Sequence, residues 1–393
     1  MTLREIADQI GVGEYPEVFE EIYKNLSPDE PACDLELIHQ LEKEHGLFGD
    51  YYEMVCEAAE LTNADPVYSA WVKVNAKYAL DTDITTTPEL PEFTSKETLV
   101  TDFLRFFVVL PQIPVSLESY KTRGFSAEEV KALLSNYRGS FKIVTRRTGR
   151  PGLDMPYFRW VTTISKARLF QTDGLQFELK LIPDMALWIR NRESGQLVPL
   201  ILKGTFHACG NKILGARGFE DPTGSFTVTF SEDEENYYGH GSFNGIVSSE
   251  KKTFPKTEWE CAGKPGDLCI VIHIPRGADI SRETTLRAIE NAKKIMKERY
   301  PEYPVKLLLG GSWLLNPQLK EMLGENSRIA QFLSCFTNYP AADRTGMAVL
   351  SFVYGRQFDN YEDMPVETTL HRKLKEIYVS GQCLIAYKGA IYL

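Results

Sequence analysis

The sequence predicts an α+β protein in which a helical first part precedes a mixed, largely antiparallel sheet flanked by helices. Apolar residues recur at helical spacing through the first part, and alternation with a period of two appears after residue 152. A continuous apolar run at residues 268–274 is followed by a helical pattern and a second apolar run, as in a strand–helix–strand unit. We therefore expect a helical domain at residues 1–150 and a sheet-containing domain at residues 151–393.

The first part contains several helical patterns and two signals for a helix start. The helical patterns cover residues 3–10, 15–26, 35–44 and 65–80, and a Thr- and Pro-rich connection follows at residues 81–96. Thr94 with Glu97, and Ser126 with Glu129, fit the capping box, in which each side chain satisfies the other residue's free backbone donor. Each pair therefore predicts the start of a helix.

Strand patterns dominate the second part. Alternating apolar residues at 175–181 and 226–230 predict half-buried antiparallel strands, and the acidic run at 231–236 is interpreted as a solvated turn rather than a metal site. Buried or later strands are predicted at residues 268–274, 305–309, 349–354 and 383–387. Ser281 is the expected N-cap of a helix that reaches Arg299, so the strands before and after this helix are expected to be parallel neighbours.

Composition and motifs limit the classes of function. The chain has 44 Lys and Arg against 54 Asp and Glu, and this net charge of −10 makes nucleic acid a poor general partner. No apolar run reaches about 18 residues, so no membrane-spanning helix is expected. The seven cysteines form no CxxC pair, which indicates reduced thiols and a cytoplasmic protein. Neither GxSxG, GxxxxGK[ST] nor GxGxxG after a strand occurs, so no motif supports a serine hydrolase, a P-loop NTPase or a dinucleotide enzyme.

The loop between the 268–274 strand and its helix is the most informative candidate site. A helix N-terminus offers free N–H groups and a positive dipole end, so it suits an anion. Gly277 permits close backbone approach, and Arg276 and Arg282 add charge for a phosphate. The alternative is a plain capped helix after a turn. His273, at the end of the strand, is either a hydrogen-bonded core residue or a catalytic base.

Three further places carry weaker signals. Residues 310–313 (GGSW) follow the next strand and either admit a ligand, with Ser312 as a donor, or form a sharp bend. Residues 146–152 are similar to an anion-binding turn, with a solvated helix end as the alternative. His207 and Cys209 are a possible ligand pair, but no second pair stands at zinc spacing, so no metal is expected.

Separated motifs in a shared order resemble a known family. They lie at residues 147–178, 238–267, 273–283 (a HIPxGxxLxxE-type segment) and 312–319 (an SWLLDPxL-type segment), and with those that follow them cover most of residues 100–393. Together they resemble the bacterial acyltransferase domain-containing family, which joins an N-acyltransferase N-terminal domain to a GNAT-like C-terminal domain. The resemblance implies a fold in which the fourth and fifth strands splay apart around a thioester. It places CoA pyrophosphate after the fourth strand, at Arg276, Gly277, Ala278, Ser281 and Arg282.

The resemblance also implies an activity. It indicates an N-acyltransferase that uses acetyl-CoA or another acyl-CoA, needs no metal, and acylates a small-molecule amine or a peptide amino group. By location, the catalytic roles would fall on His273, Glu283 and Ser312, with Tyr303 as a further candidate. The alternative is a non-catalytic GNAT-like module that binds CoA, another ligand or a protein partner.

Three departures from the family pattern favour the non-catalytic alternative. Gly310 replaces a Cys of the family pattern, and Asn316 replaces an Asp. The phosphate signature [Q/R]xxGx[G/A] is also not intact, because Arg276-Gly277-Ala278 keeps some residue types at a different spacing.

Overall fold

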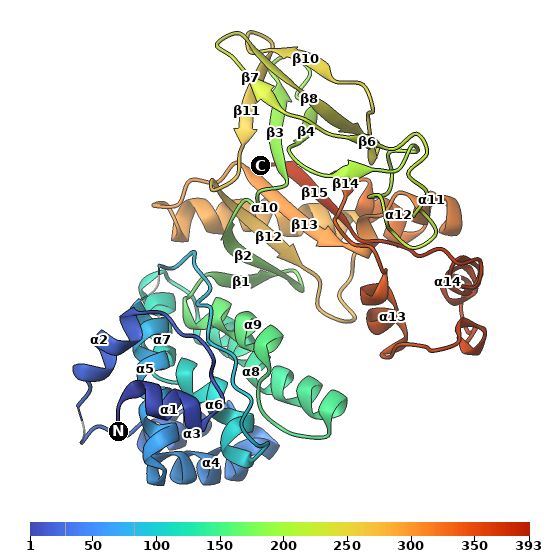
Figure 1. The fold of residues 1–393 in the computed structure, drawn as a ribbon. Helices are drawn as coiled ribbons and strands as arrows, with labels where there is room; N and C mark the ends of the chain where they lie inside the picture. The colour runs from blue at the N-terminus through green and yellow to red at the C-terminus, as the bar shows by residue number, and fades with distance from the viewer. Residues whose placement is uncertain (28, 82) are drawn as a thin grey trace. The chain divides into compact units, whose positions relative to one another are not determined.

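The chain divides into two compact units, Met1–Phe170 and Gln171–Leu393 (Figure 1). The structure is a computed structural model that describes residues 1–27, 29–81 and 83–393, so residue 82 of the predicted connection at 81–96 lies outside the described residues. The division falls after Phe170 rather than after residue 150. The reason is the helix at Met155–Ser165, which packs against helices of the first unit.

Helices build the first unit. They are α1 (Leu3–Gln9), α2 (Val18–Lys24), α3 (Leu35–His45), the 3-10 helix η1 (Gly49–Tyr51), α4 (Tyr52–Ala64), α5 (Pro66–Asp81), α6 (Leu99–Val109), α7 (Gln112–Thr122), α8 (Ala127–Thr148) and α9 (Met155–Ser165). The four predicted helical segments are confirmed as α1, α2, α3 and α5. In α1 the buried residues Leu3, Ile6 and Ala7, and in α3 the buried residues Ile38 and Leu41, recur at the spacing of an amphipathic helix.

Both ends of α8 follow their sequence signals. Ser126 Oγ accepts from the Glu129 amide at 3.2 Å, and the Glu129 carboxylate accepts from the Ser126 amide at 2.7 Å, which confirms this capping box. The helix ends at Gly149, whose φ of 76° is the left-handed conformation of a C-cap. Arg150 beyond it binds the Asp102 carboxylate at 2.8 Å. The 146–152 segment is therefore a helix end, as the alternative interpretation expected.

The other predicted capping box, at Thr94 and Glu97, is wrong. Thr94 donates its hydroxyl to the Gly11 carbonyl, so its side chain is engaged away from any helix start. Helix α6 instead begins after Thr98, and Thr101 makes the reciprocal bond to the Thr98 amide at 2.8 Å. A Thr at the position where the pattern requires Glu or Gln concealed this helix start.

The stretch Leu99–Thr122 is long and apolar enough to cross a membrane by composition. It consists of two helices, α6 and α7, and 67% of its most apolar part is buried inside the protein. Phe103 and Phe106 pack edge-to-face against Phe141 of α8, with ring centroids 5.5 and 5.4 Å apart. This packing is typical of a helix in a protein core.

The second unit combines strands with helices, and the first strand of its sheets spans the division between the units. The strands are β1 (Leu169–Thr172), β2 (Leu175–Leu181), β3 (Ala186–Asn191), β4 (Leu197–Ile201), β5 (Thr205–Phe206), β6 (Phe226–Thr227), β7 (Ser231–Glu232), β8 (Asn236–Phe243), β9 (Ile246–Val247), β10 (Lys252–Pro255), β11 (Trp259–Gly263), β12 (Leu268–His273), β13 (Leu307–Ser312), β14 (Thr337–Pro340) and β15 (Tyr387–Tyr392). The helices are α10 (Arg282–Arg299), the 3-10 helix η2 (Trp313–Leu315), α11 (Gln318–Leu323), α12 (Arg328–Leu333), α13 (Met347–Tyr354), the 3-10 helix η3 (Tyr361–Asp363) and α14 (Thr369–Val379).

Two larger sheets form from these strands. The first has the order β1-β2-β12-β13-β15-β14, and the second follows the path β10-β8-β4-β3-β11 with β7 and β9 paired to β8. Strands β12 and β13 are parallel, as predicted, and the other pairings of these sheets that are defined residue by residue are antiparallel. The expected mixed, largely antiparallel architecture is confirmed.

Several predicted strands are corrected. Residues 349–354 lie in helix α13, because a short apolar run does not separate a strand from a buried helix. The strand expected at 383–387 begins only at Tyr387, and the one expected at 226–230 is reduced to the two residues of β6. The strand expected at 305–309 begins at Leu307 and continues to Ser312.

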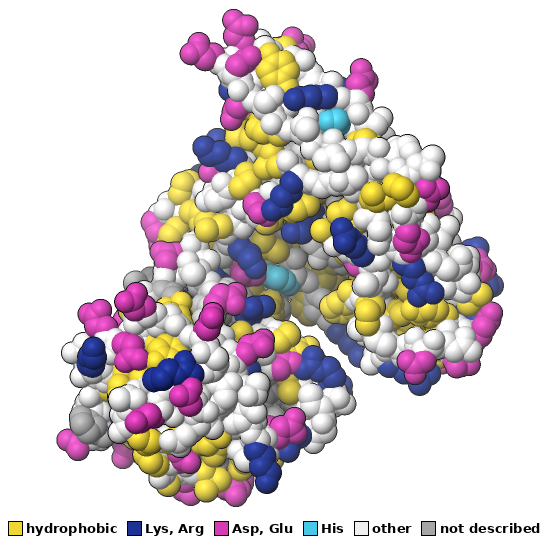
Figure 2. All heavy atoms as spheres, in the orientation of Figure 1, with side chains coloured by type: hydrophobic (Ala, Val, Ile, Leu, Met, Phe, Trp, Pro, Cys, Tyr) yellow, Lys and Arg dark blue, Asp and Glu magenta, His cyan; other side chains and the backbone are white. Residues whose placement is uncertain are grey.

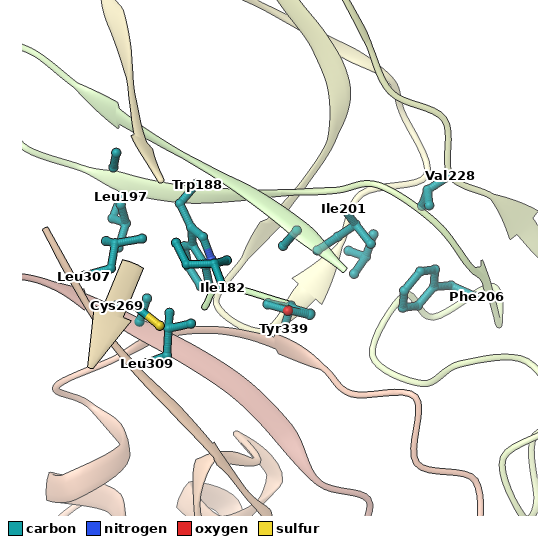
Figure 3. Packing of buried hydrophobic residues seen from close by; sticks show 14 residues of the cluster. Ile182, Trp188, Leu197, Ile201, Phe206, Val228, Cys269, Leu307, Leu309 and Tyr339 are labelled. Atoms are coloured by element: carbon teal, nitrogen blue, oxygen red, sulfur yellow. The ribbon is translucent and has the colours of Figure 1, made fainter. Parts of the chain in front are cut away.

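A core shared by the two larger sheets holds the second unit together. Figure 3 shows Trp188 of β3 beside Ile182, Leu309 and Tyr339, and the ring centroids of Trp188 and Tyr339 are 5.8 Å apart. The predicted helix α10 is confirmed with Ser281 as its N-cap. Its residues Ile289, Ala292 and Met296 are buried, whereas Leu286 is 42% exposed.

The polar positions of β2 contradict the expected half-burial. Gln176 and Glu178 are 6% and 2% exposed. Glu178 is paired with Val271, which packs into the core between the two sheets, so Gln176 and Glu178 lie on the inner face of the first sheet, whereas Lys180 further along the same face is exposed. The acidic turn at 231–236 behaves as predicted, because residues 231–235 are exposed and acidic side chains gather at this tip of the second sheet (Figure 2).

Candidate active site

The parallel pair of strands separates at one end. β12 and β13 are paired at Ile270 with Leu308 and at Val271 with Leu309. Beyond these pairs β12 continues to His273 along β2, and β13 continues to Ser312 along β15. The pairing between the two strands ends at this point, and strand edges that separate in this way can bind extended ligands.

His273 lies at this separation and is held by a buried carboxylate. Its Nε2 is 2.9 Å from Glu178 Oε2, and the two side chains are 30% and 3% exposed. Lys180, on the same face of β2, places its ammonium 3.7 Å from Glu178 Oε1. In the tautomer that donates from Nε2, the carboxylate orients the imidazole and stabilises the imidazolium that forms when the ring takes up a proton.

Glu178 is a site residue that sequence reasoning missed. Its alternation with apolar neighbours is also the pattern of a solvated strand face, so this pattern offers no reason to expect Glu178 to be buried. The contact between Glu178 and His273 follows from the register of β2 and β12. Glu178 is paired with Val271 and Gln176 with His273, so Glu178 and His273 are diagonal neighbours on one face of the sheet. An acidic residue within a strand whose neighbouring strand ends in His is a weak sequence signal for such a pair.

The loop after β12 offers an exposed backbone. Gly277 has a φ of +84°, and a Cβ placed there would meet no atom within 4 Å. The Ala278 amide donates to the Pro275 carbonyl at 3.0 Å, which closes the turn. Arg276 and Arg282 are exposed on either side of it. The loop therefore presents two guanidinium groups and an open glycine, as the predicted pyrophosphate site requires.

Asp279 occupies part of the same helix start. Its carboxylate accepts from the Ser281 amide at 2.9 Å, and from the hydroxyls of Ser281 and Thr284 at 2.9 and 2.7 Å. The bond from Thr284, then those from Ser281, lower the pKa of Asp279 to about 2, and Arg328 of α12 favours the charged form as well. The sequence indicated neither this carboxylate nor Arg328 as part of the anion site.

Glu283, Ser312 and Tyr303 have other surroundings. The Glu283 side chain is 91% exposed and lies 3.8 Å from Arg287 one turn along α10. Ser312 Oγ accepts from the Leu314 amide at 3.1 Å and so caps η2. Tyr303 lies between α10 and β13, at the end of these strands opposite His273. In the described parts of the chain neither Glu283 nor Ser312 forms a hydrogen bond with His273, and the catalytic roles of all three residues remain predictions.

The two residues that depart from the family pattern have packing roles. Asn316 is 1% exposed, donates to the Ile385 carbonyl at 3.0 Å and accepts from the Gln318 amide at 2.9 Å. A Cβ at Gly310 would lie 3.2 Å from Leu315 and 3.4 Å from Ile272, an apolar contact. Because Ile272 and His273 are successive strand residues, that contact lies on the face opposite His273. Neither departure removes a group from the His273 face.

Metal chemistry has no recognisable ligand set in the structure. Over the described ranges no group of three or more His, Cys, Asp and Glu side chains is arranged to hold a metal ion. His207 Nδ1 and Cys209 Sγ lie 3.1 Å apart, but these two side chains do not belong to a group of three or more such ligands among the described residues.

A largely antiparallel sheet whose one parallel pair separates before a loop and a long helix is the fold of GNAT-like acyltransferases. A family model described as the GNAT-like C-terminal domain matches residues 169–391, and the chain belongs to this family. The predicted fold class is confirmed.

Solved acyltransferase structures are similar to this chain over 100% of both chains. One holds decanoyl-CoA and another holds decanoyl-CoA and teicoplanin, each with 17% identity and a TM-score of 0.66. A third holds CoA and 10C-teicoplanin, with 16% identity and the same TM-score. A comparison with curated protein sequences gave no significant match. At these identities the likeness concerns the fold.

Proposed function

We propose that this protein is an acyltransferase that moves an acyl group from acyl-CoA to an amine. The observation that carries the proposal is the His273–Glu178 pair at the point where β12 and β13 separate. A base held by a buried carboxylate beside unpaired strand edges suits a reaction in which a bound thioester meets a nucleophile. Structures of similar fold that hold decanoyl-CoA support the class of donor.

The proposed reaction needs one proton acceptor. The amine nitrogen attacks the thioester carbonyl carbon, a C–N bond forms, and the C–S bond then breaks to release CoA. The surplus proton of the amine passes to His273, Glu178 stabilises the resulting imidazolium, and the proton can return to the leaving sulfur. The CoA pyrophosphate would lie on the loop that carries Arg276, Gly277, Ala278, Ser281 and Arg282.

A non-catalytic module that binds CoA, another ligand or a protein partner is the second candidate. One observation favours it: Asp279 places a carboxylate at the helix start that would hold the pyrophosphate. A negative charge there opposes the binding of a phosphate, and it uses backbone and hydroxyl donors that a phosphate would otherwise receive.

Calorimetric titration with acetyl-, butyryl-, octanoyl- and decanoyl-CoA tests the proposal first. We expect saturable binding of at least one thioester, followed by turnover in a screen of small amines and peptides with free amino groups. Binding without turnover in any pairing would favour the non-catalytic module. Failure of every thioester to bind would contradict both the acyltransferase and the non-catalytic module that binds CoA.

Substitution of His273 then tests the mechanism. His273→Gln should lower kcat by roughly 100- to 10,000-fold, the usual contribution of a general base, and should leave the acyl-CoA Kd within about threefold. Glu178→Gln should lower kcat by a smaller factor, because it removes only the charge that supports the imidazolium. His371→Gln on α14 is the matched control and should keep full activity. Unchanged kcat in His273→Gln would exclude His273 as the base.

A further inference from the structure

A small cavity lies between the two larger sheets of the second unit. Its volume is about 20 Å³, and its lining includes Leu309 and Gly310 of β13, Trp188 of β3, Tyr339 of β14 and Lys388 of β15. A cavity needs roughly 10–15 Å³ to hold one water molecule. This cavity therefore admits a single oxygen atom, such as one oxygen of a carboxylate whose remaining atoms lie outside it.

The polar side chains that line this cavity are all hydrogen-bond donors. Trp188 and Tyr339 are each 2% exposed, and Lys388 is half-buried. Across the part of the chain that the structure describes, no hydrogen-bond or ion-pair partner is found for the Lys388 ammonium, the Tyr339 hydroxyl or the Trp188 indole N–H. Indole and ammonium groups have no acceptor of their own, so the cavity calls for an acceptor from outside.

The cavity lies on the same face of the first sheet as His273. Lys388 is paired with Gly311 of β13, two residues beyond Leu309, and Leu309 is paired with Val271 of β12. Lys388 is also within electrostatic range of Lys180, whose ammonium is 3.7 Å from Glu178, the partner of His273. The cavity is therefore close enough to the candidate active site for Lys388 to interact electrostatically with Lys180, the neighbour of Glu178.

The charge around the cavity is unbalanced. Burial, and then the neighbouring Lys180, lower the pKa of Lys388, whereas Asp184 raises it. Asp184 itself forms an ion pair with Lys203, and Glu178 is held by His273 and Lys180. A half-buried ammonium that has no carboxylate of its own favours the binding of an anionic ligand group. A bound water would leave this charge uncompensated.

We propose that Lys388, Tyr339 and Trp188 form a subsite for a carboxylate of the substrate, beside the proposed acyl-transfer site. The carboxylate would belong either to a dicarboxylic acyl group, such as succinyl, or to an acceptor that is an amino acid. This inference rests on the proposed function and narrows its substrate class. Trp188 and Tyr339 donate neutral hydrogen bonds, and Lys388 supplies the charge.

Two thioesters of equal chain length test the donor arm. Succinyl-CoA and butyryl-CoA both carry four-carbon acyl groups and differ in the terminal carboxylate. Calorimetry on the full chain should show succinyl-CoA binding roughly 10- to 100-fold more tightly, the range for a charge-assisted contact. Lys388→Met should abolish this ratio and leave butyryl-CoA binding unchanged, which also shows that the variant is folded.

The acceptor arm uses amino acids and the amines that lack their carboxylate. With butyryl-CoA as donor, kcat/KM for phenylalanine and alanine would be compared with that for phenethylamine and ethylamine. An advantage of the amino acids that is lost in Lys388→Met would assign the subsite to the acceptor. The control is Lys294→Met on α10, whose side chain is 69% exposed and which should preserve either ratio.

The outcomes separate the two proposals. Binding of butyryl-CoA with no carboxylate advantage in either arm would overturn the subsite and leave the acyltransferase proposal standing. A succinyl advantage that persists in Lys388→Met would also overturn it, because the anion would then be bound elsewhere. If neither thioester binds, the proposed function fails, and the subsite fails with it as part of an acyl-transfer site.

Discussion

Glu178 and His273 form the contact on which the proposed chemistry depends. A carboxylate that is 3% exposed is stable only with partners, and here an imidazole at 2.9 Å and an ammonium at 3.7 Å provide them. Replacing Glu178 by an apolar residue would remove both the charge and the hydrogen-bond acceptor beside His273 and Lys180, whereas Gln removes the charge but keeps the shape and an acceptor. Glu178→Gln is therefore the more informative variant.

Arg282 is the residue on which the predicted pyrophosphate site is most directly tested. It is exposed at the start of α10, with Nη1 4.0 Å from Cys335 Sγ, so its guanidinium has no carboxylate within ion-pair distance among the described residues. Arg282→Glu should weaken CoA binding by roughly one to two orders of magnitude, as expected for the loss of a charge-assisted contact. Calorimetry with CoA measures this.

The control for Arg282 lies on the same helix. Lys297→Glu also reverses an exposed positive charge, but in the last turn of α10, far from the predicted phosphate position. We expect CoA affinity to stay within about threefold in this variant, since charges screened over a Debye length contribute little. Equal weakening by both variants would indicate a general effect of net charge, and unchanged affinity in Arg282→Glu would place the pyrophosphate elsewhere.

The start of α10 is the element that combines stability with the candidate site. Three donors converge on the Asp279 carboxylate there, and the helix supplies the positive end of its dipole. This arrangement fixes the turn that carries Gly277. The negative charge of the same carboxylate opposes the binding of a phosphate. Asp279 is therefore expected to affect both the stability of the fold and the affinity for CoA.

Asp279 gives the protein a defined dependence on pH. Its pKa is about 2 in the folded protein, against roughly 3.9 for an unperturbed Asp. Because the folded pKa is the lower one, the charged carboxylate stabilises the fold above about pH 4, and this contribution is lost as the pH falls toward 2. The destabilisation caused by Asp279→Asn should therefore be constant above about pH 5 and shrink below about pH 4.

Urea denaturation of the wild type and Asp279→Asn between pH 2 and pH 7 measures this dependence. Asp359→Asn serves as the control, because Asp359 is exposed and has no hydrogen-bond partner within the described ranges. Its effect should be small and independent of pH over that range. A destabilisation by Asp279→Asn that stays constant down to pH 2 would contradict the role assigned to the carboxylate.

The whole molecule consists of two units with separate cores. The first is held by packed helices with aromatic contacts such as Phe106 with Phe141, and the second by the core between two sheets around Trp188. The residues of the candidate site and of the proposed carboxylate subsite all belong to the second unit. Binding of acyl-CoA should therefore stabilise the second unit directly.

Hydrogen exchange with and without octanoyl-CoA tests this assignment. We expect the strongest added protection in β12, the following loop, the first turn of α10 and the end of β13, because a ligand that binds only the folded state suppresses local opening there. Protection that is strongest in α1–α9 would place the ligand mainly on the first unit. The Arg282→Glu variant, at a CoA concentration that saturates the wild type, is the matched control.

Local patterns determined much of this protein before any tertiary contact was considered. The spacing of apolar residues identified α1, α2, α3, α5 and α10, since a helix buries one stripe, and the order strand, helix, strand identified the parallel pair β12 and β13. Ser126 and Glu129 revealed a helix start because both partners of a capping box lie three residues apart. The resemblance to a GNAT-like family rested on motifs that lie in order along the chain, and the family model that matches residues 169–391 confirmed it.

Contacts between segments distant in the sequence were decided by the tertiary structure. Glu178 meets His273 across 95 residues, and it is buried because it lies beside Val271 on the inner face of the first sheet, which an alternation of polar and apolar residues cannot reveal. Lys388 joins Trp188 at one cavity because β15 and β3 belong to facing sheets. The helix α13 and the delayed start of β15 were equally beyond a local pattern, because a short apolar run can be buried in either conformation. Local spacing specifies which elements form, whereas the pairing and covering of those elements place the side chains of the site.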